Sequence, residues 1–267
     1  MAVTNFIPTI WSKSIQDKLE LKTVLVENCH REYEGDVDHA KTVKILAVGD
    51  PTIVDYDREN GIDPEDMSDE GQDLVIDQAK AFAFLVEDID KAQSVPGLME
   101  EYQRKSVHGL ATARDTFVAN LIKGAANQTT ATDNTEAAIK TALDLAIVAL
   151  RERNFDEEGV IELSPAVYNA FKNCLITTST NNPELIAKGV VGKYDSFDVI
   201  MSNNMAKDGG HVYCCVRGKK AIAFAGQLNK LEALRHPKKF ADVVRGLDTF
   251  GSKIIDEDRI QVVKVPV

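Results

Sequence analysis

The sequence predicts an α+β fold, and three observations support this prediction. Residues 41–48 and 80–86 alternate polar and apolar side chains, which is the period-two pattern of half-buried strands. A long amphipathic stretch then runs to Gly124, and the second half of the chain alternates shorter strand and helix patterns. The apolar fraction of 44% is that of a globular chain, and 267 residues suffice for one large domain or two small ones.

The first predicted element is a long hairpin formed by the runs 41–48 and 80–86. Between these runs, residues 57–70 contain seven acidic side chains and one arginine, a formal charge of −6 in a chain whose total is −11. A two-stranded ribbon is marginally stable in water by itself. We therefore expect the ribbon to lie on another surface, and a neighbouring copy of the chain is the expected one.

The next predicted element is one long helix that ends near Gly124, with Ser94 as its N-cap and Pro96 in its first turn. About 27 residues at 1.5 Å each span roughly 40 Å. One stripe is predicted to pack on a sheet and contains Met99, Tyr102, Ser106, Leu110, Ala113, Phe117 and Leu121. The opposite stripe is predicted to meet solvent or a partner and contains Arg104, His108, Thr112 and Asp115.

Strands and helices alternate through the rest of the chain. Asp133 and Glu136 resemble a capping box, which would begin a helix with an apolar stripe of Ile139, Leu143, Ile147 and Leu150. A strand at 160–163 leads into Ser164 and Pro165, which suit the start of a second helix. Further strands are predicted at 197–201 and, as a hairpin, at 211–216 and 220–225. The closing strands are predicted at 228–235, 240–255 and 259–265, all returning to the long helix.

Six short phrases accompany these elements in a fixed order. They are FIPTIWSK at 6–13, GDPTIVDY at 49–56, IDQAKAFAF at 76–84, DIDKAQ at 88–93, FDVIMSNN at 197–204 and FADVVRG at 240–246. Together with the acidic hairpin and the long helix, they resemble the major capsid proteins of tailed bacteriophages with the HK97-type fold. The resemblance covers nearly the whole chain. It implies an N-arm at 1–35, an extended E-loop hairpin at 36–90, a peripheral P-domain with the spine helix at 91–130, an axial A-domain at 131–228 and further P-domain strands at 229–267.

The resemblance also implies a function. The chain would be a structural subunit, not an enzyme, that assembles with itself into pentamers and hexamers of an icosahedral head around double-stranded DNA. Assembly would take place in the bacterial host cytoplasm, and the product would be part of the virion. A portal would be a further partner, and the short N-arm implies a separate scaffolding protein or none. Because 42 acids outnumber 31 bases, contact with packaged DNA is expected to be sparse and non-specific.

The subunit interface is predicted to join an acidic loop to a basic patch on a neighbouring copy. The acidic side contains Asp63, Glu65, Asp66, Asp69 and Glu70. The basic side contains Arg235, Lys238, Lys239 and Arg245, on strands where a neighbour's E-loop rests in the proteins that this chain resembles. A solvated acidic face is the alternative interpretation of the loop.

Covalent cross-linking is not expected. Some members of this fold class link subunits through a lysine on the E-loop, whereas this chain has no lysine between Lys44 and Lys80. We therefore predict a non-covalent shell.

Other function classes find little support in the sequence. The five histidines form no metal-ligand pair, and GxGxxG, GxxxxGK[ST] and GxSxG are absent, so no catalytic, cofactor or metal site is predicted. The four cysteines have no CxxC spacing and are expected to be buried free thiols. The sequence contains no run of 18 apolar residues, and its N-terminus lacks the pattern of a secretory signal, so neither membrane insertion nor export is expected. An encapsulin-type nanocompartment shell and an unrelated soluble α/β enzyme or binding protein remain as alternatives.

Overall fold

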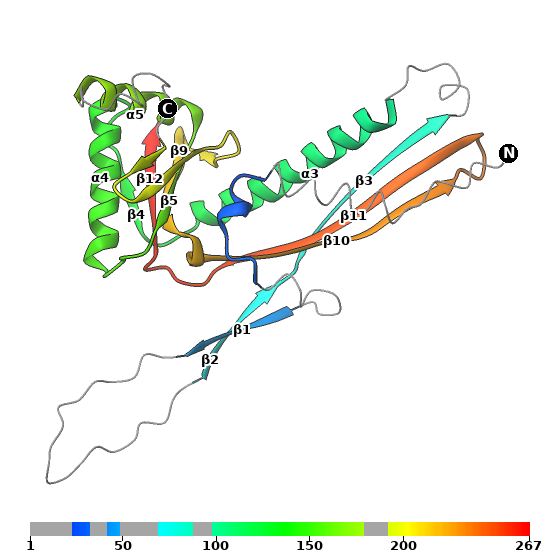
Figure 1. The fold of residues 1–267 in the computed structure, drawn as a ribbon, viewed down its shortest axis with the longest axis horizontal. Coiled ribbons are helices and arrows are strands. Elements are labelled where there is room, and N and C mark those ends of the chain that lie inside the picture. Colours follow the sequence, from blue (N-terminus) through cyan, green and yellow to red (C-terminus); the bar gives the residue numbers. More distant parts are fainter. Residues whose placement is uncertain (1–22, 33–41, 49–68, 88–97, 179–191) are drawn as a thin grey trace, which may run out of the picture.

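The computed structural model of the chain describes residues 23–32, 42–48, 69–87, 98–178 and 192–267. Two parts make up the subunit: a thick unit built around a seven-stranded sheet, and a long arm of three strands and one helix (Figure 1). A two-stranded hairpin projects below the place where the two parts meet (Figure 1). Both helices and strands are therefore prominent, and the predicted α+β class is confirmed.

The thick unit, called here the axial unit, contains one mixed sheet. Its strand order is β4 (Gln128–Thr130), β12 (Ile260–Pro266), β9 (His211–Gly218), β5 (Gly159–Leu163), β7 (Phe197–Met201) and β6 (Lys193–Tyr194), with β8 (Lys207–Asp208) also paired to β9. The pairs β12–β4 and β5–β7 are parallel, and the remaining pairs are antiparallel. Gly209 and Gly210 have positive φ angles in the tight turn from β8 to β9, which favours glycine.

Helices α4 (Glu136–Glu152) and α5 (Pro165–Thr178) belong to the same unit. The predicted apolar stripe of α4 is confirmed, because Ile139, Leu143, Ile147 and Leu150 are all buried. The predicted capping box is wrong by two residues: the N-cap is Thr135, whose side chain accepts a hydrogen bond from the Ala138 N–H. Asp133 instead accepts a hydrogen bond from the backbone N–H of Thr135 and so supports the cap from outside.

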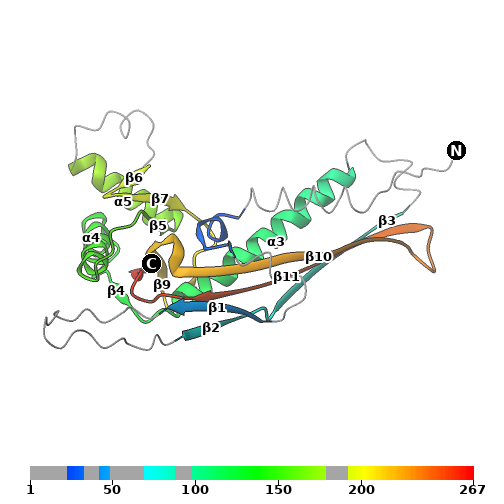
Figure 2. The same cartoon turned by 60° about the horizontal axis from the view of Figure 1, so that its bottom comes forward.

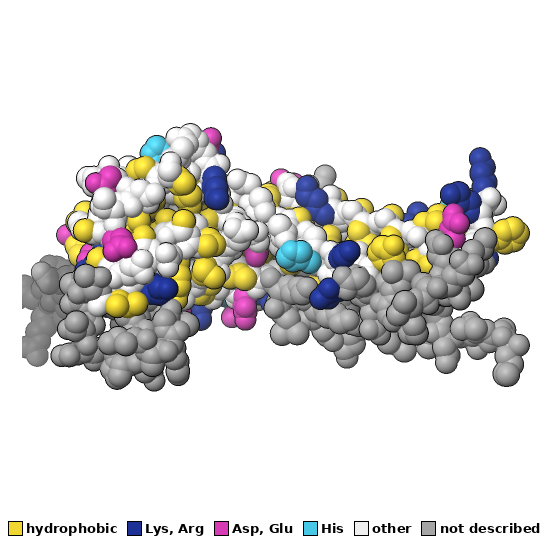
Figure 3. All heavy atoms as spheres, turned by 90° about the horizontal axis from the view of Figure 1, so that it is seen from above, with side chains coloured by type: hydrophobic (Ala, Val, Ile, Leu, Met, Phe, Trp, Pro, Cys, Tyr) yellow, Lys and Arg dark blue, Asp and Glu magenta, His cyan; other side chains and the backbone are white. Residues whose placement is uncertain are grey.

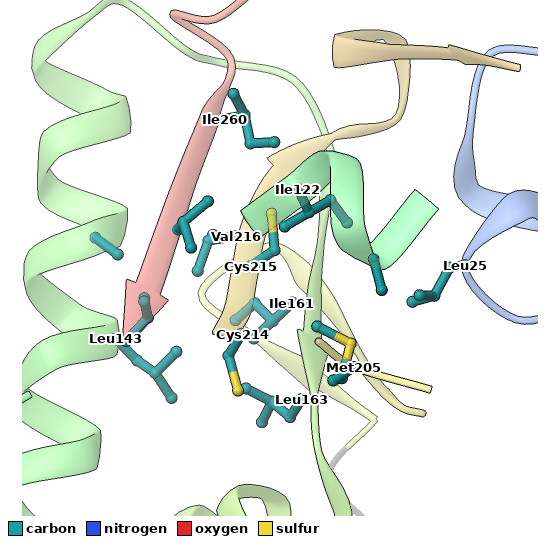
Figure 4. Packing of buried hydrophobic residues seen from close by; sticks show 14 of the residues in the cluster. Leu25, Ile122, Leu143, Ile161, Leu163, Met205, Cys214, Cys215, Val216 and Ile260 are labelled. Carbon is teal, nitrogen blue, oxygen red and sulfur yellow. The ribbon is translucent and has the colours of Figure 1, made fainter. Parts of the chain in front are cut away.

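The largest core fills both faces of the axial sheet. Cys214 and Cys215 are neighbours on β9 and would point to opposite faces, yet both are fully buried. On one side the sheet meets α4 through Leu143, and on the other it meets the end of α3 through Ile122 (Figure 4). The prediction that the cysteines are buried free thiols is confirmed for Cys29, Cys174, Cys214 and Cys215.

The arm consists of β10 (Ile222–Arg235), β11 (Ala241–Ile254) and β3 (Gln78–Glu87), with α3 (Leu98–Lys123) lying along one face (Figure 2). Aromatic pairs join the helix to the sheet at both ends of the contact. The rings of Phe84 and Tyr102 stack at 5.4 Å, and those of Phe117 and Phe250 meet edge to face at 5.5 Å. The predicted long helix is confirmed over its 26 described residues. Its predicted N-cap region, including Ser94 and Pro96, lies outside the described residues.

The predicted pairing of 41–48 with 80–86 is wrong. The run 42–48 forms β1 (Thr42–Val48), which pairs antiparallel with β2 (Asp69–Val75), and β3 pairs with β11. The alternation in β3 is real, but it places Phe82 and Phe84 against α3, whose apolar surface they cover. Periodicity reveals which face of a strand is buried, and it does not reveal the partner strand.

Two further strand assignments are corrected. The strands at 211–218 and 222–235 do not form a hairpin, because the 3-10 helix η3 (Lys219–Ala221) carries the chain from the axial sheet into the arm. Residues 259–265 were expected to return to the spine helix, but β12 pairs with β9 and β4 in the axial sheet. Moreover, β10 continues past position 228, where the expected A-domain would end, with a shift of its register to β11 between Leu228 and Lys230.

The predicted faces of α3 are only partly right. Leu110 is buried as expected, and Phe117 and Leu121 are partly buried. Asp115 was expected on the outer stripe, but it is 1% exposed. Position along the helix explains this difference: the N-terminal half covers the arm sheet alone, whereas the C-terminal half also enters the core of the axial unit, so that both stripes are covered there.

The β1–β2 hairpin is attached firmly at its root. Val43 and Ile45 of β1 and Leu74 of β2 form a separate core with Ala223 and Ala225 at the start of β10. A Cβ atom at Gly251 of β11 would lie 2.2 Å from the carbonyl oxygen of Val75, so only glycine permits this backbone contact.

Candidate subunit-interface surface

Among the residues that the structure describes, no helix covers one face of the arm sheet, and this face displays an apolar surface. Phe82, Phe84 and Val86 of β3 point toward α3, so the alternate residues of that strand lie on the open face. Cross-strand partners extend the surface over β11 and β10. Its exposed apolar members are Ala81, Ala83, Leu85, Leu234 and Leu247, with exposed fractions of 39% for Leu85 and 46% for Leu234. An apolar surface that is continuous across three strands is typical of a contact with another protein.

A shallow pocket of about 410 Å³ opens on this face. Its lining contains Ala81, Phe82, Ala83, Glu232, Arg245, Gly246 and Leu247. Gly246 has a steric role, because a Cβ there would lie 2.4 Å from the Phe82 ring. Arg245 donates to the Glu232 carboxylate beside the pocket, so the predicted interface arginine lies beside an apolar surface and carries its own counterion.

The remaining basic residues of the predicted patch lie at the far end of the arm. Arg235 ends β10, and Lys238 and Lys239 lie in the turn to β11. Figure 3 shows Lys and Arg side chains gathered at this end, beside acidic and apolar ones. Phe240 in the same turn is 84% exposed.

The structure brings each of three predicted interface cations to an acid of its own chain. Arg235 bonds Asp242 at 3.1 Å, Lys239 lies 3.4 Å from Glu87, and Arg245 bonds Glu232. These pairs are partly solvated, so each contributes only about 0–1 kcal/mol. They nevertheless reduce the positive field of the patch. Arg245 lies well inside β11, away from the turn, so the four cations do not form one cluster.

The acidic side of the predicted contact lies mostly outside the described residues. This holds for Asp63, Glu65 and Asp66. Asp69 and Glu70 begin β2, where they pair with Val48 and Ala47 at the end of the hairpin farthest from its root. The end of the β1–β2 hairpin that carries Asp69 and Glu70 therefore points away from the axial unit and the arm (Figure 1).

Two buried ion pairs in the structure were not predicted from the sequence. Arg114 of α3 donates to Asp248 of β11 at 2.8 Å, with the guanidinium 5.6 Å from the Phe224 ring centroid and 5.9 Å from that of Phe250. Arg217 of β9 makes a two-pronged contact with Glu162 of β5 at 3.1 and 2.7 Å. The available signal was a charged residue inside an apolar strand pattern, as in Val-Ile-Glu-Leu and Cys-Cys-Val-Arg.

Burial governs the titration of the groups around Arg217. Burial raises the pKa of the Glu162 carboxyl, and the neighbouring guanidinium opposes that rise. Burial alone would lower the pKa of Arg217, but Glu162 outweighs it and keeps the pKa above the ordinary arginine value. Burial also raises the pKa of the Cys29 thiol to about 11 and that of Cys214 to about 12. Such thiols are poor nucleophiles near neutral pH.

No group of three or more His, Cys, Asp or Glu side chains that could hold a metal ion occurs in the described part of the chain. Within the same ranges, no helix is both long and apolar enough to cross a membrane.

Comparison with solved structures identifies the fold class of the chain. A structure from Mycobacterium phage Che8 superimposes with a TM-score of 0.78 at 27% identity, covering 98% of each chain. The capsid of cyanophage P-SCSP1u matches with a TM-score of 0.70 at 15% identity, over 86% of this chain and 84% of the other. The mature capsid of bacteriophage PhiM1 matches with a TM-score of 0.66 at 16% identity, over 85% and 83%. Arm, axial unit and hairpin thus have the HK97-type fold of viral shell subunits.

Family membership follows from the sequence profile of the phage capsid protein family, which matches residues 71–259. The chain belongs to this family and is a major capsid protein, a structural component of the virion and not an enzyme. This finding favours the capsid interpretation over a nanocompartment shell. A search of curated proteins finds no match.

Proposed function

We propose that this major capsid protein closes into pentamers and hexamers of an icosahedral head that encloses double-stranded DNA, and that it assembles in the cytoplasm of a bacterial host. The open apolar face of the arm carries the proposal, because the described part of a single subunit leaves that face uncovered. A contact that repeats around a closed ring covers it in every copy. The acidic net charge of −11 agrees with a wall that encloses DNA without binding it tightly.

Expression of the chain alone provides the test. The purified product is expected to form closed shells that are visible by negative-stain microscopy, with no added enzyme or cofactor. Native particles should contain nuclease-sensitive DNA after disruption. A stable monomer, or shells that contain a single cargo enzyme and no DNA, would contradict the proposal. If shells form only with a second phage protein present, a separate scaffolding protein is required.

We further propose that the acidic segment of one subunit docks on the arm of the next, next to Arg245 and the basic turn. Each exposed charge pair contributes only about 0.2–1 kcal/mol, but the contact recurs at every interface. The internal partners of Arg235, Lys239 and Arg245 weaken the attraction. The apolar surface beside Arg245 supplies an additional reason for a segment to lie there.

Charge reversal tests this docking. Lys238→Glu with Lys239→Glu should leave a folded subunit that assembles poorly at low salt, and Glu65→Lys with Asp66→Lys in the same chain should restore some shells. Lys219→Glu with Lys220→Glu is the matched control, because it makes the same charge change at exposed positions of η3, away from the turn. Normal assembly of the Lys238/Lys239 variant, or equal damage by the control, would exclude the pairing.

A further inference from the structure

Residues 23–30, called here the strap, cross the junction between the axial unit and the arm (Figures 1 and 2). The strap contains the 3-10 helix η1 (Val26–Asn28). Leu25 is 0% exposed and Val26 is 1% exposed, and both belong to the same core as Ile122 of α3 (Figure 4). Three separate elements contact the strap: two belong to the arm and one belongs to the axial sheet.

The first set of contacts with the strap is made by the arm helix α3. The carboxylate of Asp115 accepts hydrogen bonds from the successive backbone N–H groups of Val24, Leu25 and Val26, at 3.1, 3.1 and 3.3 Å. Asn204 of the axial unit donates to the same carboxylate at 3.4 Å. Charge-assisted hydrogen bonds of this kind are about twice as strong as neutral ones. One side chain of α3 therefore fixes the backbone of the strap over a whole turn.

The second set of contacts with the strap is made by Arg217 of the axial sheet. Arg217, which is 0% exposed, donates to the carbonyl oxygens of Asn28 at 2.7 Å and Leu25 at 3.2 Å while it remains paired with Glu162. The guanidinium makes four hydrogen bonds to the Glu162 carboxylate and the two carbonyls, whereas a lysine ammonium has only three N–H donors on a single nitrogen. The carboxylate of Glu162 orients the guanidinium from the adjacent strand.

The third contact with the strap is a short β-bridge to the start of β10. The His30 N–H donates to the Ile222 carbonyl at 2.8 Å, and the Phe224 N–H donates to the His30 carbonyl at 3.0 Å. The strap is thus bonded to α3 and β10 of the arm and to β9 of the axial sheet. A rotation of the axial unit about the junction must break at least one of these contacts.

We propose that the strap is a brace that fixes the angle between the axial unit and the arm, with Asp115 and Arg217 as its positioning residues. In a closed shell this angle sets how steeply neighbouring subunits incline, so the brace restricts the range of shell curvature. The consequence for shells rests on the assembly proposed above. The effect on the angle concerns a single subunit and is independent of assembly.

The test uses two conservative variants of the full chain, Asp115→Asn and Arg217→Lys. Their controls are Asp248→Asn and Arg114→Lys, which alter a buried pair of the same chemistry that joins α3 to β11 without contacting the strap. Hydrogen exchange of unassembled subunits should show the amides of Val24, Leu25 and Val26 exchanging roughly 10- to 100-fold faster in Asp115→Asn, as expected for the loss of hydrogen bonds to a charge. In both controls these amides should keep the parental rate.

The angle itself is measured by single-molecule energy transfer. Dyes attached through Glu152→Cys on α4 and Lys238→Cys at the arm end report the distance across the junction, because both positions are exposed and the four native cysteines are buried. The distribution of transfer efficiency should be broader in both strap variants than in the parent and in both controls. Shells of the strap variants should then vary in diameter, whereas shells of the controls should be uniform.

Three results would overturn the proposal. They are unchanged exchange of the strap in Asp115→Asn, a transfer distribution as narrow in both strap variants as in the parent, or equal broadening in the controls. Uniform shells with a broadened distribution would overturn the link to curvature while retaining the brace. If the parent forms no shells, the proposed function fails, but the exchange and transfer measurements still test the brace.

Discussion

Removal of Arg114 has an expected cost that follows from the geometry of its partner. Asp248 has no solvent exposure and receives two hydrogen bonds from the Arg114 guanidinium, whose side chain is 5% exposed. Arg114→Ala leaves this carboxylate buried without its cation. Breaking a buried pair in this way destabilises proteins by about 3–5 kcal/mol. The lost contact between the guanidinium and the rings of Phe224 and Phe250 acts in the same direction.

Urea denaturation of unassembled subunits measures this cost. At about 2 °C per kcal/mol for a chain of this size, a loss of 3–5 kcal/mol also corresponds to a melting temperature lower by roughly 6–10 °C. A second variant distinguishes the cost of an unpaired buried charge from the cost of lost packing. Arg114→Met with Asp248→Leu replaces both partners by apolar side chains, and it should lie within about 1 kcal/mol of the parent or above it.

The two variants together can refute the argument. If Arg114→Ala costs under about 1 kcal/mol, the carboxylate finds water or another donor, and its burial does not govern stability. If the double variant is as unstable as Arg114→Ala, the loss comes from packing and not from an unpaired charge.

Three further outcomes are expected. Because burial raises the pKa of Cys29 to about 11 and that of Cys214 to about 12, iodoacetamide at pH 8 should leave both thiols unmodified in the native subunit and label them in urea; rapid native labelling, measured by mass spectrometry, would contradict their placement. Phe117→Ala should lower the unfolding free energy by about 2–3 kcal/mol, less than for a fully buried phenylalanine, whereas the exposed His108→Ala should change it by under about 0.5 kcal/mol. Mature particles should run on denaturing gels as single subunits, and a ladder of linked subunits would show that the missing lysine does not prevent cross-linking.

Local elements could be predicted from the sequence because their signals are local. The apolar stripe of α4 and the Ser164–Pro165 start of α5 depend on side chains within one or two helical turns. The length of α3 could be predicted for the same reason. The shell-forming class was also predicted, through phrases whose joint order carries more information than any of them alone.

Pairing could not be predicted, because it depends on contacts between distant residues. The alternation of β3 fits equally well beside β1 or beside β11, and the structure places it beside β11 because α3 then covers Phe82 and Phe84. Asp115 is a similar case. Its position on the helix suggested solvent exposure, and the three backbone N–H groups of the strap, together with the Asn204 side chain, make its burial favourable.

The surface position of the basic residues was predicted, whereas their role in a subunit interface stays a prediction. Arg235, Lys238 and Lys239 do gather at an exposed end of the arm. Their internal partners Asp242 and Glu87 could not be inferred, because β11 and β3 bring them close only after folding. The open apolar face beside Arg245 also escaped prediction, since it combines residues from three strands that are far apart in the sequence.

Because the β1–β2 hairpin is fixed at its root, a small change of tilt there causes a large displacement of its far end. At about 3.3 Å per residue, the seven residues of β1 extend roughly 23 Å, so a tilt of about 10° at the root would displace the far end by roughly 4 Å. A displacement of that size exceeds the reach of a hydrogen bond. The close contact at Gly251 therefore affects the position of the distant end of the hairpin, and with it the proposed docking on a neighbouring subunit. Gly251→Ala, which changes no residue at any proposed contact, should shift the acidic segment away from the neighbouring subunit.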